Sequence, residues 1–500
     1  MPDLEAHRGA ITLAFVVLYA GACFAVGIWA MRRTHTARDF FVAGRDLGIV
    51  VSGVAIFSST LSGFGFVGGP GLVYGMGMTS VWLVMTSVTG YVLTFALLGK
   101  RLRLIAEARD TVSLPDAVAA RYGSETSRWL TALAIVLGVL GYLATQILAM
   151  ATVLRDVLGG AGIGEVSLVA CVAISCAVLA FYCVAGGVIA SVYTDLFQGA
   201  IMVVAALLVF AAAQQSVEGG FAGMSATLLA DDPESIGPWG SLGMLASLSW
   251  FFLFLLGTSG QPHVITKLMM TRRPADAKRV LPLSLLGYTL SALLWIGVGL
   301  AMRALVVQGA HPELAQADQA APVFLQQYAH PLLAGVVFAG LFAAIMSTAD
   351  AFLNIGVAAL VHDFPRALRG RPPRRELFWA RVGTVAMTGV AAAFALYSHY
   401  ENARLVALLG VFGAATFAAA LVPTVSIGFN WKRATATAAN AAIAASLVIN
   451  LGIELLGVRL PWGIHGGVVA MLTSLGLFLG ISMLQAPPRL PPDIEAALDV

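Results

Sequence analysis

Apolar runs of about 20 residues recur along the whole chain, and no other feature constrains the fold as strongly. A helix of about 20 apolar residues is long enough to cross the hydrocarbon core of a bilayer. The 500 residues are 59% hydrophobic and 11% charged, whereas soluble domains are about 25% charged. The sequence therefore predicts an all-α polytopic membrane protein and excludes a chain of soluble domains.

The apolar runs predict about 13 membrane-spanning helices. The predicted spans are 10–31, 47–70, 75–98, 129–157, 164–186, 194–213, 240–258, 281–306, 331–361, 378–398, 403–430, 435–457 and 462–485. The first run is longer than the apolar core of a signal peptide, about 7–15 residues, and we expect it to be retained. The loops are too short for a soluble domain, so residues 1–500 are predicted to form one transmembrane domain.

Lysine and arginine residues gather in alternate loops. With the N-terminus outside, the 29 basic residues fall in cytoplasmic segments with few exceptions, as the positive-inside rule requires. The exceptions are Arg8, Arg155, Arg303, Arg404 and Arg459. Lys267 is assigned to a cytoplasmic loop with Arg272 and Arg273. We therefore expect a cytoplasmic C-terminus, and the net charge of +3 gives no reason to expect nucleic acid or an obligatory protein partner.

Two predicted spans contain clusters of glycine, serine, threonine and proline. Residues 58–65 read Ser-Ser-Thr-Leu-Ser-Gly-Phe-Gly, and 257–263 read Gly-Thr-Ser-Gly-Gln-Pro-His. Irregular backbone at membrane depth is tolerated only where it is buried in protein or lines a cavity. The functional interpretation of the two clusters is that the helices unwind there and bind substrate and ion. The alternative is that the small residues allow close helix packing.

The two breaks lie five predicted helices apart, which predicts an inverted repeat of five plus five helices. The first repeat would cover 47–213 and the second 240–430. The helix at 10–31 and the two helices within 435–485 would be additions, and 486–500 a cytoplasmic tail.

A third polar cluster, Ala-Ala-Ile-Met-Ser-Thr-Ala-Asp at 343–350, lies inside the ninth predicted span. An ionisable residue such as Asp350 is costly inside a membrane and indicates function. The alternative is a Ser/Thr pair that bonds back to its own helix, with Asp350 near the helix end.

Four segments together resemble the sodium/solute symporter family, in its proline- and pantothenate-carrying bacterial branches. They are 40–45, 68–74, 186–199 and 344–350. The resemblance implies a LeuT-type secondary active transporter of the bacterial cytoplasmic (inner) membrane. It would carry a small organic solute into the cell together with sodium, by alternating access.

The resemblance also implies a sodium site. By motif alignment, Na+ would bind the backbone carbonyls of Ser58, Leu61 and Ala344 and the hydroxyls of Ser347 and Thr348. Neutral oxygens from an unwound turn and a Ser/Thr pair suit a hard cation. No other cofactor is expected.

A second ion or proton position is predicted at Asp195, Ser347 and Asp350. Asp350 lies three residues after Ser347 on the same helix face, and the family brings the segment of Asp195 close to this helix. Two carboxylates in a low dielectric would share a cation or one proton. A structural pairing of these groups is the alternative.

The substrate should lie between the two breaks. The candidate contacts are Thr60, Ser62, Gly63, Tyr142, Gln146, Phe254 and Thr258. Tyr142 and Gln146 share a helix face, although Gln146 could instead make an interhelical hydrogen bond. We expect no lysine or arginine at mid-membrane, so backbone amides of the broken helices would bind an anionic group.

We predict a carboxylate-bearing solute: an amino acid, a monocarboxylate or a pantothenate-like compound. Proline is not expected, because the proline branch differs at Thr60, Phe254 and Thr258. A sugar or another solute, proton coupling, and a sensor that binds without coupled flux are the alternatives. An enzyme is not expected, because the 8 histidines are scattered and form no metal or nucleophile motif.

Overall fold

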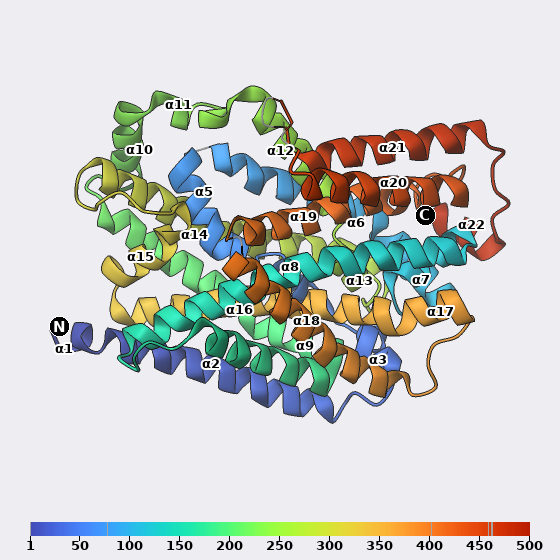
Figure 1. Ribbon diagram of the computed structural model, residues 1–500, viewed down its shortest axis with the longest axis horizontal. Coiled ribbons are helices and arrows are strands. Elements are labelled where there is room, and N and C mark those ends of the chain that lie inside the picture. Colours follow the sequence, from blue (N-terminus) through green and yellow to red (C-terminus); the bar gives the residue numbers. More distant parts are fainter. Residues whose placement is uncertain (1, 78, 402, 459, 462–463) are drawn as a thin grey trace.

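The computed structural model describes residues 2–77, 79–401, 403–458, 460–461 and 464–500 (Figure 1). Within these ranges the regular structure is helical. Leu47 and Thr271 form an isolated parallel β-bridge. Nine of the described helices are long and apolar enough to cross a membrane. The prediction of an all-α polytopic membrane protein is therefore confirmed.

The helices of the first half that lie at the predicted spans include two short ones, which share one interrupted span. These helices are α2 (Arg8–Met31), α4 (Ile49–Ser58), α5 (Gly69–Met76), α6 (Thr79–Ala108), α8 (Glu125–Gly160) and α9 (Leu168–Ser216), and the two short ones are α4 and α5. The second half contains α12 (Gly243–Thr258), α13 (Pro262–Leu268), α14 (Ala277–Val307), α16 (Pro331–Ala358), α18 (Glu376–Glu401), α19 (Ala403–Leu421), α20 (Ala436–Leu455) and α21 (Gly466–Leu484).

Short helices lie at the ends of the bundle. They include α1 (Pro2–Ala6), α3 (Ala37–Val42), α7 (Leu114–Tyr122), α10 (Gly220–Asp231), α11 (Pro233–Ile236), α15 (Ala320–Gln327), α17 (Phe364–Arg369) and α22 (Pro492–Leu498). Figure 1 shows α1, α10 and α11 at the left end, and α7, α17 and α22 at the right end. The first and last helices thus lie at opposite ends of the bundle.

The helix α9 contains a sharp corner at Gly187. This residue has φ +54° and ψ −138°, which an L side chain rarely adopts. A Cβ at Gly187 would also lie 2.6 Å from the ring and from the carbonyl oxygen of Phe40. The corner separates the spans predicted at 164–186 and 194–213. The helix resumes at once after Gly187, so residues 188–193, which lie between the two predicted spans, are helical too.

Both predicted breaks are present in the backbone. The helix α4 ends at Ser58. The chain becomes helical again in a π-helical turn at Phe64–Gly68, which leads into α5. The indole of Trp295, on α14, packs against the turn at Phe64–Gly68 and the start of α5. A Cβ atom would lie 3.1 Å from the indole at Gly65 and 2.4 Å from it at Gly69. The helix α12 ends at Thr258, and α13 starts at Pro262, whose missing N–H suits the first helical position.

The helix α16 lies at the centre of the bundle. In the span that contains it, 83% of the most apolar window is buried, against 28% for α2 and for α18. It packs on α9, α8 and α2. The polar cluster predicted at 343–350 is therefore surrounded by protein, and its polar groups need partners from neighbouring helices.

Candidate ion and substrate site

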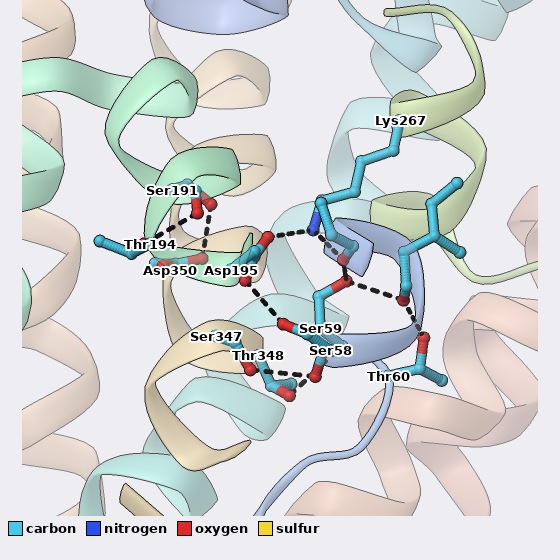
Figure 2. A network of polar contacts seen from close by, with 12 residues as sticks. Ser58, Ser59, Thr60, Ser191, Thr194, Asp195, Lys267, Ser347, Thr348 and Asp350 are labelled. Atoms are coloured by element: carbon cyan, nitrogen blue, oxygen red, sulfur yellow. Dashed lines mark hydrogen bonds and ion pairs between the residues drawn. The ribbon is translucent and has the colours of Figure 1, made fainter. Parts of the chain in front are cut away.

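The Ser/Thr pair of α16 meets the end of α4 (Figure 2). The Ser347 hydroxyl donates to the carbonyl oxygens of Ser58, at 3.0 Å, and Ala344, at 3.1 Å. The Thr348 hydroxyl donates to the carbonyl oxygens of Ser59, at 3.0 Å, and again Ala344, at 3.1 Å. The structure thus joins four of the residues predicted to bind sodium.

The end of a helix explains why these carbonyls are available. The last carbonyls of a helix have no intrahelical amide partner, and α4 ends at Ser58. Leu61, the fifth predicted ligand, bonds through its amide to the Phe57 carbonyl at 3.2 Å. The carbonyl of Ser59, which was not among the predicted ligands, accepts the hydrogen bond from Thr348.

This group of oxygens suits a small hard cation. A hydroxyl has one proton and two lone pairs, so Ser347 and Thr348 can rotate from donating to carbonyls toward coordinating an ion. The carbonyls of Ser58, Ser59 and Ala344 complete a set of neutral oxygens, the ligand type that hard cations prefer.

A buried ion pair lies directly beside these oxygens. The Lys267 ammonium is 2.8 Å from Oδ2 of Asp195 and donates to the Ala55 carbonyl at 2.7 Å. The Ser58 hydroxyl donates to Oδ1 of Asp195 at 3.0 Å. Asp195 is 0% and Lys267 4% exposed.

The placement of Lys267 corrects two expectations. Its assignment to a loop is wrong, because Lys267 lies in the helix α13, and the expectation that no lysine there would pair with a carboxylate is contradicted by its ion pair with Asp195. The reason is that the chain becomes helical again at Pro262, and α13 keeps the Lys267 side chain buried.

Asp350 is buried against α9. Its carboxylate accepts hydrogen bonds from the Tyr182 hydroxyl, at 2.8 Å, and the Ser191 hydroxyl, at 2.6 Å. Asp195, Ser347 and Asp350 lie on the facing sides of α9 and α16 (Figure 2). Each has its own partners: Asp195 bonds Lys267 and Ser58, and Ser347 bonds backbone carbonyls.

Four of the predicted substrate residues come together where the first break meets α8. The Gly63 amide donates to Oε1 of Gln146 at 3.1 Å, and the Tyr142 hydroxyl donates to the Ser62 hydroxyl at 3.0 Å. A Cβ at Gly63 would lie 2.8 Å from the Ile345 side chain, so the break also touches α16.

The hydroxyls of Thr60 and Thr258, two of the other three predicted substrate residues, bond back to carbonyls four residues earlier. The carbonyl that accepts from Thr258 belongs to the third residue, Phe254. The Thr60 hydroxyl donates to the Ile56 carbonyl at 2.7 Å. The Thr258 hydroxyl donates to the Phe254 carbonyl at 2.7 Å. Thr258, on α12, packs against α6. A Cβ atom added at Gly90 of α6 would lie 2.7 Å from the Cβ of Thr258.

An aromatic group beside Tyr142 was not predicted from the sequence. The Phe352 ring lies 4.5 Å, centroid to centroid, from Tyr142, 4.5 Å from His263 and 5.6 Å from Phe417. His263 is 2% exposed, and both of its ring nitrogens lack a hydrogen-bond partner among the described residues. The position of His263 directly after Pro262 of the second break was the available signal.

The model of the sodium:solute symporter family matches residues 40–447. The chain belongs to this family. Membership makes it a sodium-coupled solute symporter, with Na+ as the coupling ion, and an integral membrane protein.

The curated relatives of this symporter are transporters, and the match covers nearly the full length of each chain. The sodium/pantothenate symporter of Escherichia coli is 27% identical over 470 residues, which cover 93% of this chain and 94% of that protein. The osmoregulated proline transporter of Bacillus subtilis is 26% identical over 482 residues, covering 94% of each chain. A solved Na+-coupled sialic acid symporter shares the fold, with a TM-score of 0.79, 20% identity, and 96% and 99% coverage.

The symporter also carries a buried charged cluster at the right end of the bundle in Figure 1. Asp116 on α7 forms an ion pair with Arg128 on α8. Nε2 of His362 lies 2.9 Å from Oδ2 of the same Asp116. The Ser113 hydroxyl donates to Asp363 at 2.7 Å. Burial would raise the pKa of Asp116, but the hydrogen bond and charge of His362, together with the charge of Arg128, hold it well below its usual range.

Proposed function

We propose that this symporter carries a small carboxylate-bearing solute into a bacterial cell, together with sodium, by alternating access across the inner membrane. The observation that carries the ion assignment is the set of oxygens at Ser58, Ser59, Ala344, Ser347 and Thr348, which joins α16 to the end of α4. A hydroxyl–carbonyl set between a central helix and a break is suited to bind a cation and to hold the break closed while the ion is present.

The proposed topology has about 13 spans in a LeuT-type arrangement, with the N-terminus outside. Two observations support it. The first and last helices lie at opposite ends of the bundle, as an odd number of spans requires (Figure 1). Arg366 and Arg369 of α17 lie at the same end as α22, which fits a cytoplasmic side rich in basic residues.

The proposed solute site lies between the first break and α8, at Ser62, Gly63, Tyr142 and Gln146. The Gly63 amide of the break donates to a side chain, Gln146, that a solute can displace. The ring nitrogens of His263 have no hydrogen-bond partner among the described residues, whereas the Lys267 ammonium is paired with Asp195. Backbone amides at broken helices bind carboxylates without a lysine or arginine. Pantothenate and proline, the solutes in the relatives' names, both carry a carboxylate.

A thermal-shift screen of the purified protein tests the solute class. Amino acids other than proline, monocarboxylates, pantothenate and sugars are compared with and without sodium. We expect a carboxylate compound to raise the melting temperature, and to do so more strongly when sodium is present, because coupled ligands stabilise the state that binds both. Stabilisation by sugars alone would contradict the proposal. Sodium-driven counterflow in proteoliposomes separates transport from binding without flux.

The sodium ligands are tested by Ser347→Ala and Thr348→Ala. Each removes one coordinating oxygen, and we expect the sodium concentration for half-maximal thermal stabilisation to rise about tenfold or more, equivalent to about 1.4 kcal/mol. Thr384→Ala on α18 is the matched control, because its hydroxyl bonds back to the Ala380 carbonyl of its own helix at 2.9 Å. Unchanged sodium affinity in both site variants would refute the ion assignment.

A further inference from the structure

The Lys267 ammonium occupies a position that a metal cation could otherwise take. It contacts one carboxylate oxygen, on Asp195 of α9, at 2.8 Å and one backbone carbonyl, on Ala55 of α4, at 2.7 Å. Carboxylate and carbonyl oxygens are also the ligands that hard cations select. The side chain reaches this place from α13, directly after the second break (Figure 2).

We infer that Lys267 is a tethered cation that fills the ion position beside Asp195, so that this symporter couples each solute to one sodium ion and not to two. The inference rests on the proposed sodium site and adds the coupling ratio to it. It also replaces the second ion predicted at Asp195, Ser347 and Asp350 with a lysine side chain that stays in the protein.

Charge balance supports this assignment. Both oxygens of the buried Asp195 carboxylate are already engaged, one by the Lys267 ammonium and the other by the Ser58 hydroxyl. An unpaired charge in a low dielectric is strongly unfavourable, and the Lys267 ammonium at 2.8 Å stabilises the ionised form of Asp195. The neighbouring Asp350 accepts its hydrogen bonds from the Tyr182 and Ser191 hydroxyls, whereas the Lys267 ammonium donates to Asp195.

The ion pair is connected to the sodium site through a single residue. The Ser58 hydroxyl bonds Asp195, and the Ser58 carbonyl accepts from Ser347. Lys267 itself joins α13 to the end of α4 through Ala55. The tethered cation therefore also fixes the half-helix after the second break against the half-helix before the first.

A sodium titration of thermal stability tests the inference on the purified, full-length protein. For the unaltered chain we expect a Hill coefficient of about one, because cooperativity cannot exceed the number of sites. In Lys267→Met the carboxylate loses its cation. We expect a lower melting temperature without sodium, recovery on adding sodium, and a Hill coefficient that rises toward about two.

Matched variants separate charge from packing. Lys267→Met combined with Asp195→Asn removes both charges, and we expect it to regain most of the sodium-free melting temperature with a Hill coefficient of about one. Lys278→Met, an exposed lysine on α14, should change neither quantity. If Lys267→Met alone does not accumulate, the double variant decides: recovery of folded, sodium-responsive protein supports the inference, and no recovery overturns it.

The outcomes distinguish the two proposals. A Hill coefficient of about two in the unaltered protein, or a Lys267→Met variant with unaltered sodium-free stability and a Hill coefficient of about one, overturns the tethered cation. The absence of any sodium response in the unaltered protein would instead overturn the sodium site itself.

Discussion

At the scale of single residues, the site combines two ways of handling charge in a buried place. The oxygens around Ser347 and Thr348 are neutral, so they can be buried with only hydrogen bonds to satisfy them. Asp195 is charged and has a fixed cation in Lys267. Ser58 belongs to both arrangements, because its carbonyl contacts Ser347 and its hydroxyl contacts Asp195.

Gln146→Leu tests the solute site at this scale. The substitution leaves the Gly63 amide without its acceptor, and an unsatisfied buried amide costs about 1–3 kcal/mol. We expect a lower melting temperature and a roughly tenfold rise in the solute KM, measured by uptake into proteoliposomes. Gln326→Leu, at an exposed position on α15, is the control. A lower melting temperature with unchanged KM would identify Gln146 as an interhelical bond only.

The residues of the ion site could be predicted in kind but not in every detail. Adjacent hydroxyls in an apolar helix and a Gly/Ser-rich break are costly patterns that singled out the two segments. The family resemblance then grouped Ser347 with Ser58, and these two residues are hydrogen-bonded in the structure. The choice between the carbonyls of Ser59 and Leu61 depends on the dihedral angles of an unwound turn, which composition does not specify. Lys267 was misplaced because charge counting follows chain position and not the path of a helix after its break.

At the scale of elements, interruptions of the helices position the site. The breaks after Ser58 and Thr258 leave carbonyl and amide groups without helical partners. Gly187 divides α9 so that Tyr182 and Ser191, on its two sides, both reach Asp350. The breaks could be predicted from glycine, serine and proline clusters, whereas the π-helical turn at Ala359–Asp363 carries no comparable sequence signal.

Gly187→Ala tests the corner in α9. The backbone angles are unfavourable for alanine, and its Cβ would lie 2.6 Å from Phe40, so we expect a loss of about 1–3 kcal/mol in stability. Gly21→Ala in α2 is a control of opposite sign: a Cβ there meets nothing within 4 Å, and helical alanine is favoured over glycine by about 0.5–1 kcal/mol. Equal melting temperatures for the two variants would contradict the assigned strain.

At the scale of the whole molecule, the charged cluster around Asp116 ties separate elements together. It joins α7 and α8 to the segment that follows α16 and, through a 2.5 Å contact between His362 and Glu376, to the start of α18. Arg128 contacts both Asp116 and Asp363, so the cluster balances its charges internally. The sequence did not reveal it, because its members are far apart along the chain.

Asp116→Asn tests this cluster through pH. The folded pKa of Asp116 lies below the usual value of about 4, so its charge stabilises the fold above that value, and the stabilisation is lost as pH falls toward the folded pKa. We expect the variant to melt lower than the unaltered protein near neutral pH, with a gap that narrows below about pH 4. A gap that stays constant down to about pH 3 would show that packing, and not charge, explains the loss.

The contact between Trp295 and the glycines of the first break has an experimental consequence. The indole is 5% exposed and would touch any Cβ at Gly65 or Gly69. The surroundings of this one chromophore therefore change whenever the break shifts relative to α14. Replacing the other tryptophans among the 9 in the chain would give a protein whose intrinsic fluorescence follows the closing of the break in real time, without an attached dye.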